Sequence, residues 1–353
     1  MSWVLAFLGF AALVLLHEAG HFTAAKAVGM RVERFAIFFP PLIAKVRRGE
    51  TEYGIGAVPL GGYVRITGMN PAEEIPPELA HRAYYRQPVW KRIVVIAAGP
   101  AVNIVLAFLI LWVLYLFVGY TGGPAIVGRV EKGTPAGAVL QPGDAVLAIN
   151  GAKPQGRLLN DQLDWIGRKI NASHGQPITI TVRRDGETLT VSGSPFNDKK
   201  LKRYRFGFGY RDGTHQTAPP VAAAGMALDE MYAVTSRTVS AIVNIFVPED
   251  RKQLSSVVGG YETTRAAISF SAAAALEVLA LISLSLGVIN LFPFLPLDGG
   301  HIFWALAEKV RRRPISFVTM ERAGFVGFAL VICLFLVGLS NDIDRIANGG
   351  GFR

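Results

Sequence analysis

The chain has 353 residues, of which 51% are hydrophobic, and it carries a formal net charge of +10. The apolar residues come in long blocks with the basic residues beside them. This pattern favours loops next to anionic lipid and argues against a partner among nucleic acids. The single cysteine, Cys333, excludes an internal disulfide and a zinc site built on cysteine.

Four apolar stretches are long enough to cross a hydrocarbon layer of about 30 Å, which takes about 20 residues. They cover residues 3–25, 93–118, 272–292 and 324–339, and the last is short unless it extends back toward Val318. The first stretch lacks a preceding Lys or Arg and contains ionisable residues. We therefore expect a retained span there and not a cleaved signal peptide.

Basic residues concentrate in two loops, at 26–92 and 309–313. The positive-inside bias places both loops in the cytoplasm. Both chain ends and the long region 119–271 are then expected on the opposite side of the lipid bilayer.

Residues 17–21 read His-Glu-Ala-Gly-His and lie inside the first apolar stretch. Positions i and i+4 of a helix share one face, so His17 and His21 can bind one zinc ion with Glu18 beside them as general base. The same pattern also occurs on solvated helices. Here it follows an almost wholly apolar segment, where ionisable groups are costly, and a polar packing cluster is the alternative explanation.

Two regions outside the spans have β-strand patterns. Region 45–67 is rich in Gly and Tyr and predicts a hairpin on the cytoplasmic side. Region 122–194 predicts a compact soluble domain, with strands at 126–130 and 178–182, a helix at 163–170 and an Asp185-Gly186 hairpin turn. After it, residues 195–271 are expected to form a linker and an amphipathic helix at 221–246 that does not cross the membrane.

Asp298 is the candidate third zinc ligand, since a catalytic zinc has three protein ligands and one open position. It follows the third apolar stretch, after Pro293 and Pro296 have ended the helix. At about 1.5 Å per residue, His17 lies about 21 Å into the membrane, and the third span brings Asp298 to the same leaflet. A helix cap is the alternative role for Asp298. His301 would close the site as a fourth ligand and is expected outside the ligand set.

Together these features resemble the site-2 protease family of intramembrane metalloproteases, and within it the bacterial regulator-of-sigma-E protease group. The resemblance rests on four segments in the order of the family, which are His17–His21, Gly61-Gly62-Tyr63, Gly99-Pro-Ala-Val-Asn103, and Asn290-Leu-Phe-Pro with Leu297-Asp298-Gly299-Gly300. It implies that His17, His21 and Asp298 hold Zn²⁺ and that Glu18 activates water. It also implies a role in substrate or oxyanion positioning for Asn290, with helix packing as the alternative; for Asn103 packing is favoured.

The soluble domain resembles a PDZ domain of the bacterial protease type. The carrying residues are Gly133-Thr-Pro-Ala136 and Gln141-Pro-Gly-Asp144 with Ile149-Asn150-Gly151. Larger relatives have two such domains, whereas one is found here. The domain is expected either to bind peptide or protein ends by strand addition or to act as a steric gate.

The sequence thus predicts a mainly α-helical polytopic membrane protein with four transmembrane helices, a cytoplasmic-side β-hairpin and one inserted α/β PDZ-like domain. Residues 1–118 are expected to hold the first two transmembrane helices and the hairpin, and residues 122–194 the PDZ-like domain. Residues 195–271 are expected to form the linker and amphipathic helix, and residues 272–353 the last two transmembrane helices with Asp298. The resemblance implies an inner-membrane enzyme whose PDZ-like domain faces the periplasm.

The same resemblance implies single-span membrane substrates that are already trimmed, such as anti-sigma factors or signal-peptide remnants. An unwound substrate strand is expected to pair with the hairpin edge at Gly61, Gly62 and Tyr63. A zinc or cation transporter and an inactive PDZ scaffold are the alternatives. The first would carry ligands on several spans, and the second need not keep Glu18.

Overall fold

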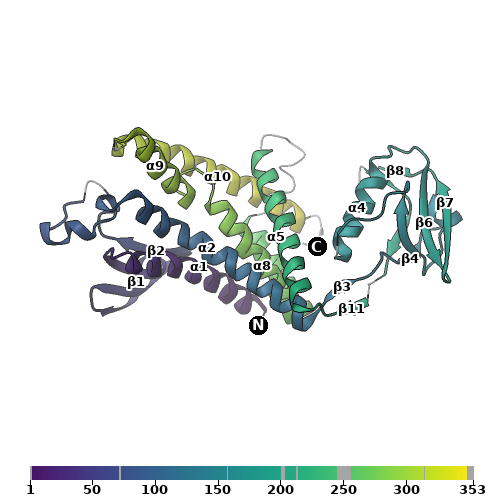
Figure 1. The fold of residues 1–353 in the computed structure, drawn as a ribbon, viewed down its shortest axis with the longest axis horizontal. Coiled ribbons are helices and arrows are strands. Elements are labelled where there is room, and N and C mark those ends of the chain that lie inside the picture. Colours follow the sequence, from purple (N-terminus) through teal and green to yellow (C-terminus); the bar gives the residue numbers. More distant parts are fainter. Residues whose placement is uncertain are drawn as a thin grey trace. The chain divides into compact units, whose positions relative to one another are not determined.

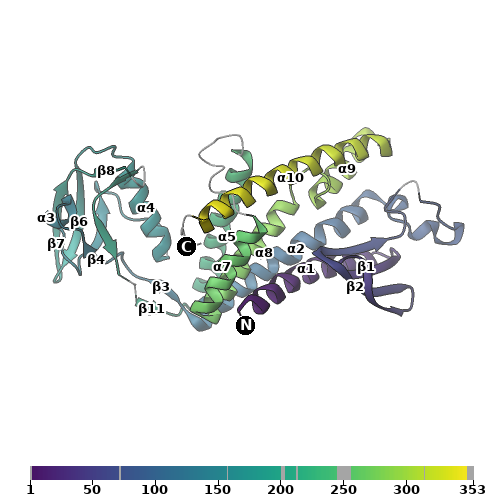
Figure 2. The same ribbon diagram turned by 180° about the vertical axis from the view of Figure 1, so that it is seen from behind.

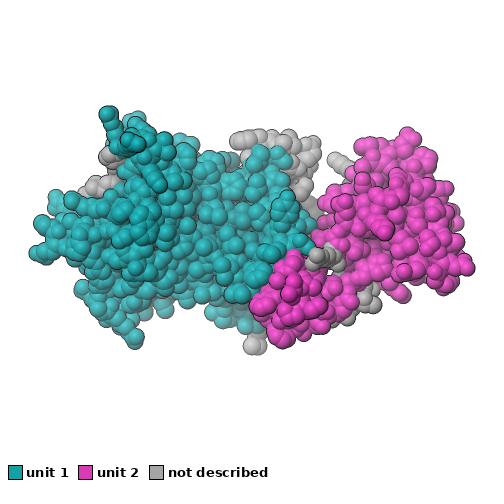
Figure 3. Space-filling model, in the orientation of Figure 1, with its two compact units in different colours: residues 1–111, 227–353 teal, residues 112–226 magenta. Residues whose placement is uncertain are grey.

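The computed structural model describes residues 2–70, 73–156, 158–199, 203–211, 214–244, 256–313 and 315–347. The chain forms two compact units (Figure 3). Unit 1 comprises residues 1–111 and 227–353, and unit 2 comprises residues 112–226. Unit 1 holds the long helices and one two-stranded sheet, whereas unit 2 holds most of the short strands (Figures 1 and 2).

Four of the described helices are long and apolar enough to cross a membrane. They are α1 (Ser2–Ala27), α2 (Val89–Val113, continued by a π-helical turn at Leu114–Val118), α8 (Ala272–Asn290) and α10 (Phe317–Ala347). The four expected spans coincide with these helices, and the fourth does extend back to Val318. The protein is therefore mainly helical and has four membrane-capable helices.

The remaining helices of the described chain are shorter or more polar. Helix α5 (Pro220–Val243) is not among the four membrane-capable helices, and its expected end at residue 246 lies outside the described residues. Helix α7 (Val257–Phe270) packs against α1 and α8. The buried carboxylate of Asp342 in α10 accepts hydrogen bonds from the Ser256 and Gly259 amides at the start of α7. Helix α9 (Asp298–Arg311) follows α8 after a tight loop.

The sheet of unit 1 is built from two long antiparallel strands, β1 (Val32–Arg48) and β2 (Thr51–Ile66). Phe35 of β1 pairs with both Tyr53 and Val64, so the first half of β1 lies between the two halves of β2. The hairpin therefore begins at residue 32 and not at residue 45 as expected. The sequence hides this because Pro40 and Pro41 interrupt the strand pattern within β1.

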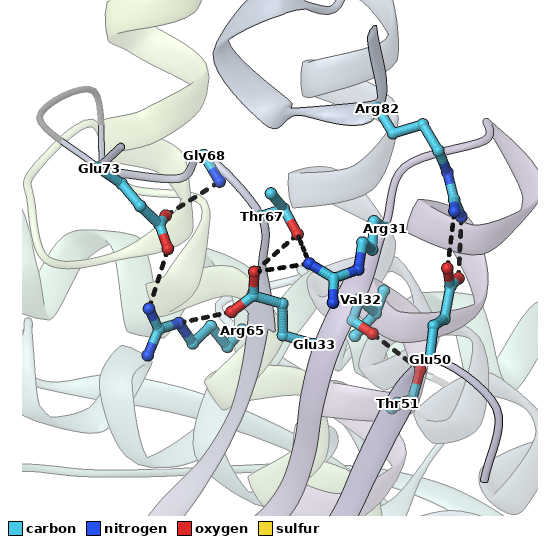
Figure 4. Close-up of polar contacts among 10 residues, drawn as sticks. All are labelled: Arg31, Val32, Glu33, Glu50, Thr51, Arg65, Thr67, Gly68, Glu73 and Arg82. Atoms are coloured by element: carbon cyan, nitrogen blue, oxygen red, sulfur yellow. Dashed lines mark hydrogen bonds and ion pairs between the residues drawn. The ribbon is translucent and has the colours of Figure 1, made fainter. Parts of the chain in front are cut away.

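Charged side chains tie the base of this hairpin to the segment that follows it (Figure 4). Arg82, which ends the 3₁₀ helix Pro77–Arg82, donates to both carboxylate oxygens of Glu50 at 2.6 and 2.8 Å. These hydrogen bonds hold the pKa of Glu50 below its ordinary value. Arg65 of β2 forms ion pairs with Glu33 and Glu73. The hairpin is thus anchored at one end by its charged residues.

Unit 2 has a three-stranded antiparallel sheet with β6 (Ile178–Arg184) between β5 (Ala145–Ile149) and β7 (Glu187–Gly193). The turn between β6 and β7 has positive φ angles at Asp185 and Gly186, as the Asp-Gly pair predicts. The other strands pair as β3 (Tyr120–Gly122) with β11 (Thr214–Gln216), β4 (Val127–Val130) with β10 (Phe208–Tyr210), and β8 (Phe196–Asp198) with β9 (Arg203–Arg205).

Two helices complete unit 2, α3 (Pro135–Val139) and α4 (Leu159–Asn171). Ile166 of α4 and Ile180 of β6 are fully buried in one core together with Phe206, which is 1% exposed. Phe206 belongs to this core, and β10 pairs with β4. The unit therefore continues past residue 194, where the sequence suggested a linker. The sequence missed this because the strands there are only three residues long.

Candidate metal centre

Helix α1 places His17 and His21 one helical turn apart on a buried face. Their side chains lie edge to face with ring centroids 4.9 Å apart, and the two Nε2 atoms are 3.2 Å apart. The histidines are 8% and 7% exposed. Two imidazole nitrogens therefore point at one spot inside a membrane-capable helix bundle.

Asp298 is the first residue of α9, and its carboxylate reaches the same spot. Its Oδ2 atom lies 3.2 Å from Nε2 of His17 and 3.3 Å from Nε2 of His21. A helix-cap role would turn the carboxylate to the amides of α9, but Oδ2 is buried with no hydrogen-bond partner among the described residues. Among these residues, His17, His21 and Asp298 form a group able to hold a metal ion.

The spacing and the tautomer of the cluster fit zinc. Two ligands at about 2.0–2.1 Å from a tetrahedral ion are about 3.3 Å apart, close to the three observed distances. The Nδ1 atom of His21 donates to the carbonyl oxygen of Val95 at 2.9 Å. A carbonyl can only accept, so the proton lies on Nδ1 and the Nε2 lone pair faces the cluster, as in metal sites with a backbone partner.

Gly99 of α2 lies directly against the two imidazoles. A Cβ atom at this position would collide with Nε2 of His21 and would lie 2.9 Å from Nε2 of His17. Glycine is therefore needed at this turn of α2 for the helix to pass this close to the cluster. Neither Val95 nor Gly99 was assigned to the site from the sequence, although the motif Gly99–Asn103 was the available signal for Gly99.

A cavity of about 490 Å³ opens beside the cluster. Glu18 lines it together with the two histidines and Asp298, and so does His301, which is not part of the group of candidate ligands. The cavity wall includes every residue that the sequence suggested for the site, which are His17, Glu18, His21, Gly61, Gly62, Tyr63, Asn290 and Asp298. Residues far apart in the chain thus meet around one space.

Strand β2 forms a wall of the cavity and contacts Glu18. A Cβ atom on Gly62 would lie 2.7 Å from Cγ of Glu18, so the main chain of β2 touches this side chain. Tyr63 is held in place by Arg34, which donates to its hydroxyl at 2.8 Å, and by a stacked contact with Phe39. Asn290 lines the cavity from the last turn of α8.

Comparisons with known proteins agree on one family. The sequence model of peptidase family M50 matches residues 5–334. A zinc metalloprotease homologue of Mesorhizobium japonicum is 31% identical, covering 94% of this chain and 95% of its own length. The zinc metalloprotease Rip1 of Mycobacterium tuberculosis is 28% identical, and the match covers 94% of this chain and 94% of Rip1.

A likeness to a solved structure falls in a smaller part of the chain. The crystal structure of the PDZ domain of an SdrC-like protein from Listeria monocytogenes has a TM-score of 0.21 and 23% identity. The match covers 26% of this chain and 88% of the Listeria chain.

The M50 match spans the helices that carry the histidines, Glu18 and Asp298. Its zinc metalloprotease relatives share nearly the full length of the chain, which decides against the transporter suggested as an alternative from the sequence. With four membrane-capable helices, the protein is a multi-pass membrane protein. The chain therefore belongs to peptidase family M50 and is a zinc-dependent intramembrane protease of the site-2 type.

Proposed function

We propose that His17, His21 and Asp298 hold the zinc ion of this protease and that Glu18 is its general base. The single observation that carries the proposal is the spacing of the three ligand atoms, 3.2 to 3.3 Å, beside a carboxylate in a shared cavity. When bound, zinc lowers the pKa of a coordinated water and polarises a carbonyl oxygen.

The residues of the chain supply the remaining steps of peptide hydrolysis. The Glu18 carboxylate takes a proton from the attacking water and delivers it to the nitrogen of the leaving amine. The Asn290 side-chain amide lines the same cavity and donates to a substrate carbonyl, which fixes the scissile bond. His301 stays outside the ligand set and lines the wall next to Asp298.

The edge of β2 at Gly61, Gly62 and Tyr63 is the proposed docking site for the substrate backbone. Among the described strands, β2 pairs only with β1, which leaves the outer edge at these residues for an added strand. A transmembrane helix hides its peptide bonds in its own hydrogen bonds, so it must unwind before cleavage. An unwound segment that pairs with this edge would lie in the cavity, next to Glu18.

The proposed substrates are single-span membrane proteins that have lost their outer domains, such as anti-sigma factors or signal-peptide remnants. The proposed topology has the hairpin on the cytoplasmic side of the bacterial inner membrane and unit 2 on the periplasmic side, which the positive-inside bias of the basic loops supports. Unit 2 is proposed to be PDZ-like. Its groove of about 160 Å³ between α4 and residues 203–210 would receive a peptide end, and its bulk would exclude untrimmed ectodomains.

The test is a Glu18→Gln variant, assayed for zinc content and for cleavage of a labelled transmembrane substrate. We expect full zinc content and a loss of cleavage of at least about 100-fold, as removal of a general base gives. Glu277→Gln is the matched control, because Glu277 lies in α8 but does not line the cavity, and it should retain activity. Full cleavage by Glu18→Gln with zinc bound would refute the assignment of the base.

A further inference from the structure

A partly buried ion pair joins helix α2 to helix α9 away from the metal cluster. Nη2 of Arg92 lies 2.6 Å from Oε2 of Glu308, and Arg92 is 5% exposed. The guanidinium also lies over the ring of Tyr85, 5.7 Å from its centroid. An arginine buried this deeply is costly without its partner, so the contact fixes the position of both helices strongly.

Both partners stand on helices that build the metal centre. On α2, Arg92, Val95 and Gly99 follow one another at intervals of three and four residues, so they lie on one face. Val95 orients His21, and Gly99 lies against both histidines. On α9, which has 14 residues, Asp298 is the first residue and Glu308 lies in the last turn, three residues before Arg311.

The apolar contact between these helices does not fix their relative position along the axis. Ile302 of α9 packs against the apolar cluster that contains Val95 and Ile96. Apolar contacts are non-directional, whereas a short charged hydrogen bond has a defined geometry. A slip of α9 by one residue would move Asp298 by about 1.5 Å, which is enough to separate its carboxylate from the histidines.

We propose that Arg92 and Glu308 are positioning residues that set α9 at the height where Asp298 meets His17 and His21. This inference rests on the proposed role of Asp298 as a zinc ligand. The pair touches neither substrate nor metal, and it acts through the rigid helix between Glu308 and Asp298. It supports the ligand from the far end of α9, where the sequence gives no hint of a connection to the site.

The test measures zinc affinity of the full chain in detergent by competition with a chelator that changes colour on binding zinc. The Arg92→Met/Glu308→Leu double variant replaces the pair by apolar residues, which keeps the fold without a buried unpaired charge. We expect its zinc affinity to fall by about 10- to 100-fold, as changes in residues that support ligands do. Arg92→Lys keeps the charge and should recover most of the affinity.

The control is Glu50→Gln, which breaks the Glu50–Arg82 pair at the hairpin base, and it should bind zinc as the wild type does. Wild-type affinity in the apolar double variant, with Asp298→Asn impaired, would overturn the positioning role and leave the proposed function intact. Wild-type affinity in Asp298→Asn would overturn both.

A second pair of variants decides the case if the apolar double variant does not fold. Glu308→Arg places two cations together and should lose zinc, whereas Arg92→Glu/Glu308→Arg restores the attraction and should restore binding. Failure of the folded exchanged pair to bind better than Glu308→Arg would overturn the proposal.

Discussion

The imidazole of His21 is held on both of its nitrogen atoms. One nitrogen donates to the Val95 carbonyl, and the other faces His17 and Asp298. Because the backbone of α2 selects the tautomer, the lone pair is already in place before an ion binds, and no rearrangement of the ring is required. At the scale of single residues, the orientation of this candidate ligand is thus set by the backbone of α2 at Val95.

Two glycines at this site should respond differently to the same substitution. Gly99→Ala places a methyl group against both histidines and should lower zinc affinity, whereas Gly62→Ala presses on Glu18 and should lower kcat by about 100-fold with zinc content unchanged. Gly260→Ala in α7 is the control, since its new methyl group would have only ordinary contacts. Zinc titration and single-turnover cleavage measure the two effects, and loss of zinc in Gly62→Ala would contradict the distinction.

At the scale of elements, the two proposed peptide sites are both strand edges beside a helix. In unit 1, β2 faces the cavity that also contains Glu18 of α1. In unit 2, residues 203–210 face α4 across a groove lined by Leu163, Gly167 and Ile170. An exposed edge supplies main-chain hydrogen bonds to any extended peptide, and the side chains around it limit which peptides fit.

Filling the groove of unit 2 should abolish peptide binding there. A side chain at Gly167 would meet no atom within 4 Å of its Cβ, so Gly167→Trp can occupy the groove without straining α4. We expect loss of binding to extended C-terminal peptides, measured by fluorescence anisotropy, and an unchanged melting temperature. The exposed Lys153→Trp is the control, and peptide binding that persists in Gly167→Trp would place the ligand elsewhere.

At the scale of the whole molecule, both units combine apolar packing with ion pairs. Unit 1 has apolar membrane-capable helices and a charged network around its hairpin, whereas unit 2 has one compact apolar core with ion pairs at Asp144 and Arg205. The buried Asp144 accepts two hydrogen bonds of 2.7 Å from Arg184. Protonation of Asp144 in acid should therefore destabilise unit 2.

The melting temperature of unit 2 should fall as the medium becomes acidic. The hydrogen bonds from Arg184, together with the amide of Gln141, lower the pKa of Asp144. The unfolded chain has a higher pKa, about 3.9, so the stabilisation is complete above about pH 5 and is lost as pH falls through the folded value. Asp144→Asn should lower the melting temperature near neutral pH and weaken its dependence on acid. A variant with the wild-type pH profile would contradict this.

Periodicity and composition predict the parts of this fold that are local in sequence. The four membrane-capable helices, the Asp185-Gly186 turn and the meeting of His17, His21 and Asp298 could all be expected from the chain. Contacts that depend on tertiary packing could not. The double pairing of β1 and the burial of Phe206 arise only when distant strands meet, and Arg92 finds Glu308 across 216 positions of sequence.

The Gly62 contact with Glu18 has a consequence for the choice of substrate. At Gly62, the strand residue in contact with the base, the enzyme presents main chain and no side chain that could distinguish one amino acid from another. Discrimination between good and poor targets then depends on how readily a helix loses its regular form, in addition to the side chains around the strand edge. Proline, glycine and polar residues promote this loss. Cleavage sites in different targets should therefore share helical instability more than a consensus motif.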